Sequence, residues 1–115
     1  MKTFDKAISW LYRHGRPIDV ARYEYLFLSR DKDTCINALI SYQNEDGGFG
    51  HGLEPDSQNP FSSPVTTWMA FEIMEELELD NSCEIVKNTL RYLTEDAPMK
   101  DGFYLSMIPT NNNYP

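Results

Sequence analysis

A short polar loop carries the side chains of this sequence that are best suited to chemistry. His51, Glu54 and Asp56 place an imidazole and two carboxylates within six residues, and Asp46 precedes them. Such a set can ligate a divalent cation, orient a sugar hydroxyl or transfer protons between paired carboxylates. The competing interpretation is a solvated connection in which Asp56 forms an Asx-type turn and Glu54 lies on the surface. The sequence leaves both open and names His51, Glu54 and Asp56 as candidate catalytic residues.

No cofactor and no metal site is predicted. The loop has one His, and its spacing to the acids matches no standard zinc pattern. The only two cysteines, Cys35 and Cys83, lie far from any CxxC spacing and are expected to be buried free thiols. If a small molecule binds, the expected contacts are Asp46, His51, Glu54, Asp56 and the aromatic Trp68.

The loop follows a glycine-rich turn, YQNEDGGFG, which spans residues 42–50. Glycines permit positive φ and a sharp reversal, and a glutamine near a helix end can bond backbone groups left without partners there. An aromatic ring after the glycines can pack between neighbouring helices. We therefore expect Gln43, Gly47, Gly48 and Phe49 to be structural residues.

A similar sequence pattern recurs 51 residues further on. NALISYQNEDGG begins at Asn37 and NTLRYLTEDAPMKDG at Asn88, and three extra residues bring Gly48-Phe49 onto Gly102-Phe103. Each copy reads as a helix followed by a glycine-aromatic turn. A period of about 50 residues is typical of stacked helical hairpins that bury their apolar faces on one another.

The segment Gln43–Gly50 resembles the QxxDGGFG/QxxDGGW repeat of protein prenyltransferase β-subunits and of squalene and oxidosqualene cyclases. The whole chain also looks like a group of uncharacterised bacterial proteins with a WLxRHGRP-like start, here residues 10–17. The resemblance implies an all-α fold made of helical hairpins of an incomplete α/α toroid. The group's chains are expected to continue past Pro115, so we expect this chain to be an N-terminal portion of a longer toroid.

The catalytic motifs of the resembled enzymes are not found. The string nearest to the cyclases' DxDD acid is residues 31–34, which read DKDT and lack the final Asp. Neither Cys35 nor Cys83 lies in a motif like the zinc site of the prenyltransferases. The resemblance therefore implies a fold and not an activity.

Periodicity predicts five helices and no strand in one domain of residues 1–115. The expected helices are 3–14 with Thr3 as N-cap, 19–28 with Asp19 as N-cap, 34–43 with Asp33 as N-cap, 64–79 with Ser63 as N-cap, and one capped by Asn81 or Ser82 that runs to Leu93. The fourth is expected to be buried on more than one side, through residues that include Val65, Trp68 and Phe71. His14 is expected at a helix C-terminus, where the helix dipole favours it.

The bulk composition excludes some partners. The net charge of −8 disfavours nucleic acid, because phosphate binding needs clustered Lys and Arg. The first residues have no apolar signal-peptide core and no run approaches the ~20 apolar residues of a membrane span, so a cytoplasmic protein is expected. Open ends of a helical array expose apolar faces, which predicts a homo-oligomer. The favoured function is a non-catalytic binding or structural module; the alternative is the N-terminal part of an enzyme that acts on an isoprenoid or carbohydrate-like substrate through residues 46–56.

Overall fold

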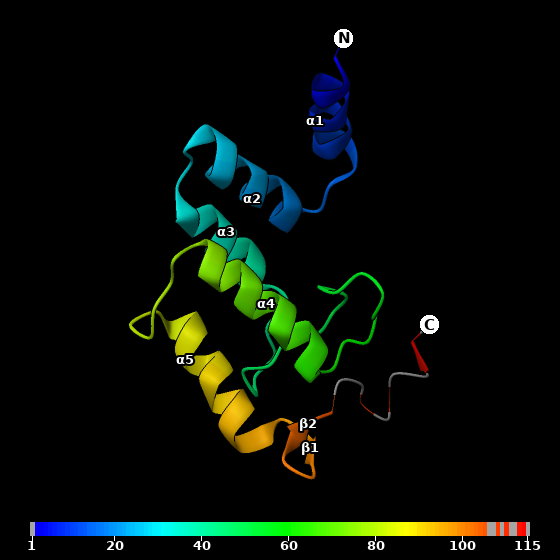
Figure 1. Cartoon of the computed structure of the whole chain (residues 1–115), viewed down its shortest axis with the longest axis vertical. Coiled ribbons are helices and arrows are strands. Elements are labelled where there is room, and N and C mark those ends of the chain that lie inside the picture. Colours follow the sequence, from blue (N-terminus) through cyan, green and yellow to red (C-terminus); the bar gives the residue numbers. More distant parts are fainter. Residues whose placement is uncertain (1, 106–107, 109, 111–112, 115) are drawn as a thin grey trace. The chain divides into compact units, whose positions relative to one another are not determined.

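The computed structural model describes residues 2–105, 108, 110, 113 and 114, and these form two compact units (Figure 1). The first unit comprises residues 1–41 and the second residues 42–115. The described residues are mostly helical, as the sequence predicts. Whether the helices belong to an α/α toroid stays a prediction. Pro115 lies outside the described residues.

The first unit consists of three helices, α1 (Thr3–His14), α2 (Pro17–Leu28) and α3 (Lys32–Ile40). Helix α2 packs on α3 and also contacts α1. Tyr23 of α2 meets the ring of Tyr12 edge-on at a centroid distance of 6.0 Å and stacks on Phe27 at 5.4 Å. The buried side chains of this unit are Ile18, Ala21, Cys35 and Leu39.

The predicted N-caps of these helices are wrong by one to three residues. Lys2 caps α1 in place of Thr3, and Arg16 caps α2 in place of Asp19. Asp31 caps α3 in place of Asp33, because its carboxylate accepts a hydrogen bond of 3.0 Å from the Thr34 amide. That bond lowers the pKa of Asp31. An acidic residue in the first turn is favourable at several positions, so its presence locates the turn but not the cap.

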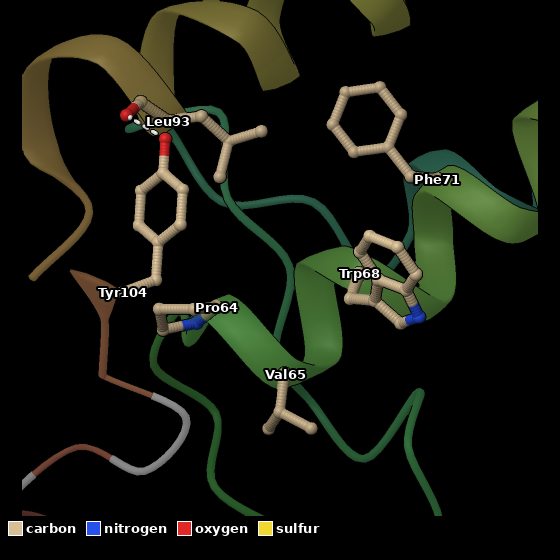
Figure 2. A pocket seen from close by; sticks show the side chains of 6 residues that line it. All are labelled: Pro64, Val65, Trp68, Phe71, Leu93 and Tyr104. Atoms are coloured by element: carbon tan, nitrogen blue, oxygen red, sulfur yellow. Dashed lines mark hydrogen bonds between the residues drawn. The ribbon is translucent and has the colours of Figure 1, made fainter. Parts of the chain in front are cut away.

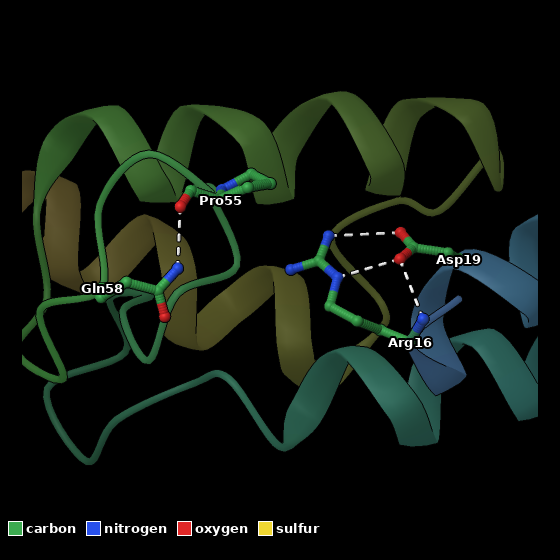
Figure 3. Close-up of polar contacts among 4 residues, drawn as sticks. All are labelled: Arg16, Asp19, Pro55 and Gln58. Carbon is green, nitrogen blue, oxygen red and sulfur yellow. Dashed lines mark hydrogen bonds and ion pairs between the residues drawn. The ribbon is translucent and has the colours of Figure 1, made fainter. Parts of the chain in front are cut away.

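Asp19 instead stabilises the N-terminus of α2 from the third helical position, as in a capping box. It accepts hydrogen bonds from the Arg16 backbone amide at 3.1 Å and from Arg16 Nε at 2.9 Å (Figure 3). Desolvation works to raise the pKa of Asp19, but the bonds from Arg16 outweigh it and the net shift is downward. His14 lies in the last turn of α1, as predicted.

The second unit contains α4 (Pro64–Glu76), α5 (Glu84–Arg91) and a π-helix, η1 (Tyr92–Asp96). Ser63 caps α4 and Pro64 takes its first position, which confirms that prediction. Helix α4 stops three residues before the predicted end, because Glu78 adopts a left-handed φ of 56°. Cys83 caps α5, where Asn81 or Ser82 was expected.

A small β-hairpin contradicts the prediction that the chain has no strand. Strands β1 (Met99–Lys100) and β2 (Phe103–Tyr104) pair in antiparallel fashion. Between them Asp101 and Gly102 both have positive φ, 54° and 82°. Two successive residues with positive φ, in the order Asp-Gly, are typical of a type I′ hairpin turn.

The long connection before α4 is not a solvated loop throughout. Phe49 and Leu53 are completely buried, together with core residues of the helices, which include Ala70, Ile73, Leu77 and Tyr92. Gln58 Nε2 donates to the Pro55 carbonyl at 2.7 Å, one of several bonds that close the connection on itself (Figure 3). In the described part of the chain, no helix combines the length and apolar character of a membrane span.

Candidate functional site

Gln43 fastens the glycine-rich turn to α5. It lies beyond the end of α3, which stops at Ile40, although the sequence predicted a helix up to Gln43. Its Nε2 lies 3.0 Å from the Gly47 carbonyl, 3.3 Å from the Ile85 carbonyl and 3.2 Å from Thr89 Oγ1. One amide group thus bonds the turn itself and a helix more than 40 residues away.

The glycines and the aromatic ring of the turn are tightly enclosed. Gly47 has φ of 91°, and a Cβ there would lie 1.9 Å from the Asn88 carbonyl oxygen of α5. A Cβ on Gly48 would lie 2.5 Å from Ser62 Cβ. Phe49 is fully buried, and its amide donates to Thr67 Oγ1 of α4 at 3.0 Å. This turn is therefore part of the packed core of the second unit.

A series of side-chain hydrogen bonds along the turn connects two of the predicted ligand contacts, Asp46 and His51. Asp46 Oδ1 accepts from the Gly48 amide at 2.8 Å and from Ser62 Oγ at 2.7 Å. Ser62 Oγ in turn accepts from Asn44 Nδ2 at 2.9 Å, and Asn44 Oδ1 lies 2.7 Å from His51 Nε2. His51 has a left-handed φ of 59° and is exposed. Asp46 and His51 are thus linked through side chains that already bond one another.

Glu54 and Asp56, the other two predicted residues of the loop, are not part of this series of hydrogen bonds. Glu54 Oε1 accepts from the Asp56 backbone amide at 3.1 Å, so its carboxylate closes its own turn. Asp56 is exposed. No three His, Cys, Asp or Glu side chains among the described residues form a group that could hold a metal ion. The geometry does not assemble His51, Glu54 and Asp56 into one constellation.

Tyr92 is a buried titratable group that the sequence did not single out. Its side chain is 2% exposed, and its hydroxyl has no hydrogen-bond partner among the described residues. Burial raises the pKa of Tyr92, and the carboxylates of Asp46 and Asp96 raise it further. The tyrosine therefore stays protonated and contributes packing rather than charge.

A hollow beside α4 is a candidate binding surface of the second unit. It has a volume of about 450 Å³ and is lined by Pro64, Val65, Trp68, Phe71, Leu93 and Tyr104 (Figure 2). The Tyr104 hydroxyl donates to the Leu93 carbonyl at 2.9 Å, and Trp68 Nε1 donates to Glu72 at 2.7 Å. Because both polar groups are already bonded, the hollow offers apolar surface.

A second hollow of about 320 Å³ adjoins the first and shares Trp68 and Phe71 with it. Its further lining residues are Glu72, Met74, Glu75, Leu79 and Val86. Together the two hollows form what we call the α4 groove, apolar at the Pro64 end and acidic at the Glu75 end. Trp68, the predicted aromatic contact, lies where they meet.

The α4 groove corrects the prediction that α4 is buried on more than one side. Trp68 is 66% exposed, and Val65 and Phe71 are only half-buried. The signal was present in the sequence, because residues 64, 65, 68, 71, 72 and 75 fall on one stripe of a helix. What the sequence did not show is that, in the described part of the unit, Trp68 on that stripe stays exposed and Val65 and Phe71 are only half-buried.

Comparison with known proteins gives no match to a protein-family model, a curated protein or a solved structure. The resemblance to the prenyltransferase and cyclase repeat therefore rests on residues 43–50 and the similar pattern that recurs further on. It stays a prediction, and function has to be argued from the groove and the loop.

Proposed function

We propose that this chain is a non-catalytic helical module of the prenyltransferase and squalene cyclase-like type that binds an apolar partner in the α4 groove. The observation that carries the proposal is the groove itself, two adjoining hollows with a mainly apolar lining that includes the exposed rings of Trp68 and Tyr104. A side chain such as Trp68, with two-thirds of its surface in water, gains free energy when a partner covers it. We place the protein in the cytoplasm as part of the same proposal.

The groove favours neutral or cationic partners. Its charged lining residues are the carboxylates Glu72 and Glu75. A diphosphate or another anion would be repelled at that end, whereas an apolar group with a positive charge would be attracted. This charge distribution argues against an isoprenoid diphosphate as the occupant of the α4 groove.

The loop of residues 46–56 supports a structural role more than the alternative of an enzyme. The carboxylates of Asp46 and Glu54 accept hydrogen bonds from backbone amides of their own turns. Such bonds are those of Asx-type and related turns, and they orient both groups toward the backbone. One oxygen of each carboxylate is thus committed to its own turn.

The proposal is tested with a neutral solvatochromic dye such as Nile red, at low micromolar protein concentration. We expect saturable binding with a blue-shifted emission, weakened at least tenfold by Trp68→Ala. Phe61→Ala is the matched control, since Phe61 is 55% exposed but does not line the groove. Absence of dye binding, or equal loss in both variants, would contradict an apolar binding site at the α4 groove.

A further inference from the structure

Aromatic rings and carboxylates share one face of helix α4. The rings of Trp68 and Phe71 line both hollows of the α4 groove, and Glu72 and Glu75 line the second. Positions 68, 72 and 75 follow one another at intervals of four and three residues, so these side chains leave the helix on the same side. The α4 groove therefore presents an aromatic surface and negative charge to the same occupant.

A hydrogen bond holds the indole of Trp68 against a carboxylate. Trp68 Nε1 donates to Glu72 Oε1 at 2.7 Å, which places this carboxylate at the edge of the ring. The side chain of Trp68 is nevertheless 66% exposed, and Glu75 is exposed as well. Neither Glu72 nor Glu75 forms an ion pair within the described part of the chain. The indole ring and the negative charge beside it are thus open to a ligand.

A positively charged group is attracted by both features. The face of an indole carries the negative part of the ring quadrupole and is the best aromatic partner for a cation. The carboxylates of Glu72 and Glu75 add direct charge attraction, which is stronger near a protein surface than in bulk water. Phe71 and Tyr104 supply further rings around the first hollow (Figure 2). Aromatic surroundings of this kind recognise quaternary ammonium groups in proteins.

A quaternary ammonium group fits the groove better than a primary one. A primary ammonium has three N–H donors, and each loses free energy if it finds no acceptor on leaving water. The first hollow offers few acceptors, because its lining side chains are apolar except for the indole of Trp68, a donor, and the hydroxyl of Tyr104. A quaternary ammonium has no N–H to leave unpaired, and its methyl groups gain free energy on apolar surface.

The dimensions of the groove indicate a small molecule. The two hollows have volumes of about 450 and 320 Å³. Small-molecule sites are typically roughly 300–1,000 Å³ in volume, with a mainly apolar lining and a few polar groups that fix orientation. An amphiphilic cation can place its apolar part in the first hollow and its charge beside Glu72 and Glu75 in the second.

We propose that the α4 groove binds a small amphiphilic cation of the quaternary ammonium class. The alkyl part of the ligand packs on the apolar lining of the first hollow, and its positive charge lies over the indole of Trp68, beside Glu72 and Glu75. The inference rests on the proposed function, since it requires the groove to be a binding surface, and it names the class of ligand.

The test is a ligand titration followed by ¹⁵N NMR at the indole N–H groups. The chain has two tryptophans, so Trp68 reports on the groove and Trp10, which does not line it, is the internal control. Trp10→Phe assigns the two signals. The ligands share one alkyl chain and differ in the head group: hexyltrimethylammonium, hexylammonium, 1-hexanol and hexanoate.

The expected order of affinity follows from the head groups. At low ionic strength hexyltrimethylammonium should shift the Trp68 signal with an affinity about tenfold higher than that of the uncharged 1-hexanol. Hexylammonium should bind with an affinity between these two, and hexanoate should bind least, because Glu72 and Glu75 repel its carboxylate. Added salt should reduce the preference for the quaternary cation over 1-hexanol.

Neutral variants separate charge from apolar contact. Glu72→Gln with Glu75→Gln should reduce the preference for hexyltrimethylammonium over 1-hexanol to less than about threefold, while binding of Nile red persists. The glutamine at position 72 keeps an oxygen that can accept the bond from Trp68 Nε1. The matched control, Glu45→Gln with Glu84→Gln, removes two charges at exposed sites that do not line the groove, and it should keep the full preference.

Four results would overturn the inference. A chain that binds Nile red but binds hexyltrimethylammonium no more tightly than 1-hexanol keeps the proposed function and loses the cation as its ligand. Equal affinity for hexylammonium and hexyltrimethylammonium removes the quaternary class. A preference that falls equally in the neutral variant and in its control, or in neither, reflects the net charge of −8 and not the groove. If neither Nile red nor any of the hexyl ligands shifts the Trp68 signal, both proposals fail.

Discussion

Two glycine-aromatic turns of this molecule look alike in sequence but differ in the burial of their aromatic rings and in their hydrogen-bond partners. The first, Gly47-Gly48-Phe49, holds a completely buried ring. The second, Gly102-Phe103, belongs to a β-hairpin, and its ring is 77% exposed. The comparison teaches that a repeated pattern fixes the local reversal of the chain but not the burial of the residues that follow it.

The difference comes from the partners that each turn reaches. Gln43 bonds α5 as well as its own turn. Thr94, the residue 51 positions later, donates through its hydroxyl to the Leu90 and Arg91 carbonyls one turn before it. Long-range hydrogen bonds tie the first turn into the core, whereas the described bonds of the second are those of its own hairpin and one from the Tyr104 hydroxyl to the Leu93 carbonyl.

The aromatic rings provide the largest expected contrast. Phe49→Ala should lower the free energy of unfolding by about 3–5 kcal/mol, because it leaves a cavity in a packed core. Phe103→Ala should change this free energy by less than about 0.5 kcal/mol, because an exposed ring makes few packing contacts in the folded state. Urea unfolding followed by circular dichroism measures both. If Phe49→Ala does not fold, Phe49→Leu should still unfold at lower urea than Phe103→Ala; equal midpoints would remove the distinction between the turns.

Alanine substitutions at the two glycines separate the cost of backbone strain from the cost of steric overlap. Gly47 and Gly102 have similar positive φ, 91° and 82°, so an alanine suffers a similar strain of roughly 1 kcal/mol at either site. Only at Gly47 does the new Cβ meet backbone, the Asn88 carbonyl oxygen, whereas at Gly102 it meets nothing within 4 Å. We therefore expect Gly47→Ala to be destabilised by about 3 kcal/mol and Gly102→Ala by about 1 kcal/mol. Thermal unfolding of the two variants tests this, and a larger loss in Gly102→Ala would contradict it.

The polar residues give the smallest expected contrast. Gln43→Ala should destabilise the chain by about 2 kcal/mol, because it removes the donor that the Gly47 carbonyl, the Ile85 carbonyl and Thr89 Oγ1 share. Gln43→Glu should be worse, since it turns an acceptor toward the oxygens of Gly47, Ile85 and Thr89. Thr94→Ala, the matched control, should lose less than about 0.5 kcal/mol. Chemical unfolding gives the three values, and a Gln43→Glu variant as stable as Gln43→Ala would show that the amide donates no bonds that matter.

Parts of the fold could be predicted wherever a local signal is unambiguous. Ser63 followed by Pro64 fixed the start of α4, because a hydroxyl cap and a proline without an amide hydrogen both favour that position. The other predicted caps were wrong. At α3 two acids compete, and the caps of α1, α2 and α5 are Lys2, Arg16 and Cys83, residue types that no capping preference indicates. Asp101-Gly102, a strong hairpin signal, was read as part of a repeat and its strands were missed.

The candidate loop was predictable in its composition but not in its bonding. The sequence places His51, Glu54 and Asp56 close together along the chain. It does not show that Asn44 and Ser62 link Asp46 to His51, nor that Glu54 closes its own turn. Side-chain pairing across 16 residues depends on how the connection folds back on α4, which no local spacing determines.

By itself the sequence determined a helical protein, the position of the glycine-rich turn and the stripe of apolar residues on α4, because these depend on periodicity and on backbone φ. Only the tertiary structure decided which turn is buried, which carboxylates are already bonded and which face of α4 lies open. Those properties depend on residues far apart in the chain, such as Gly47 against Asn88 and Trp68 with Tyr104, and burial follows from where such residues meet.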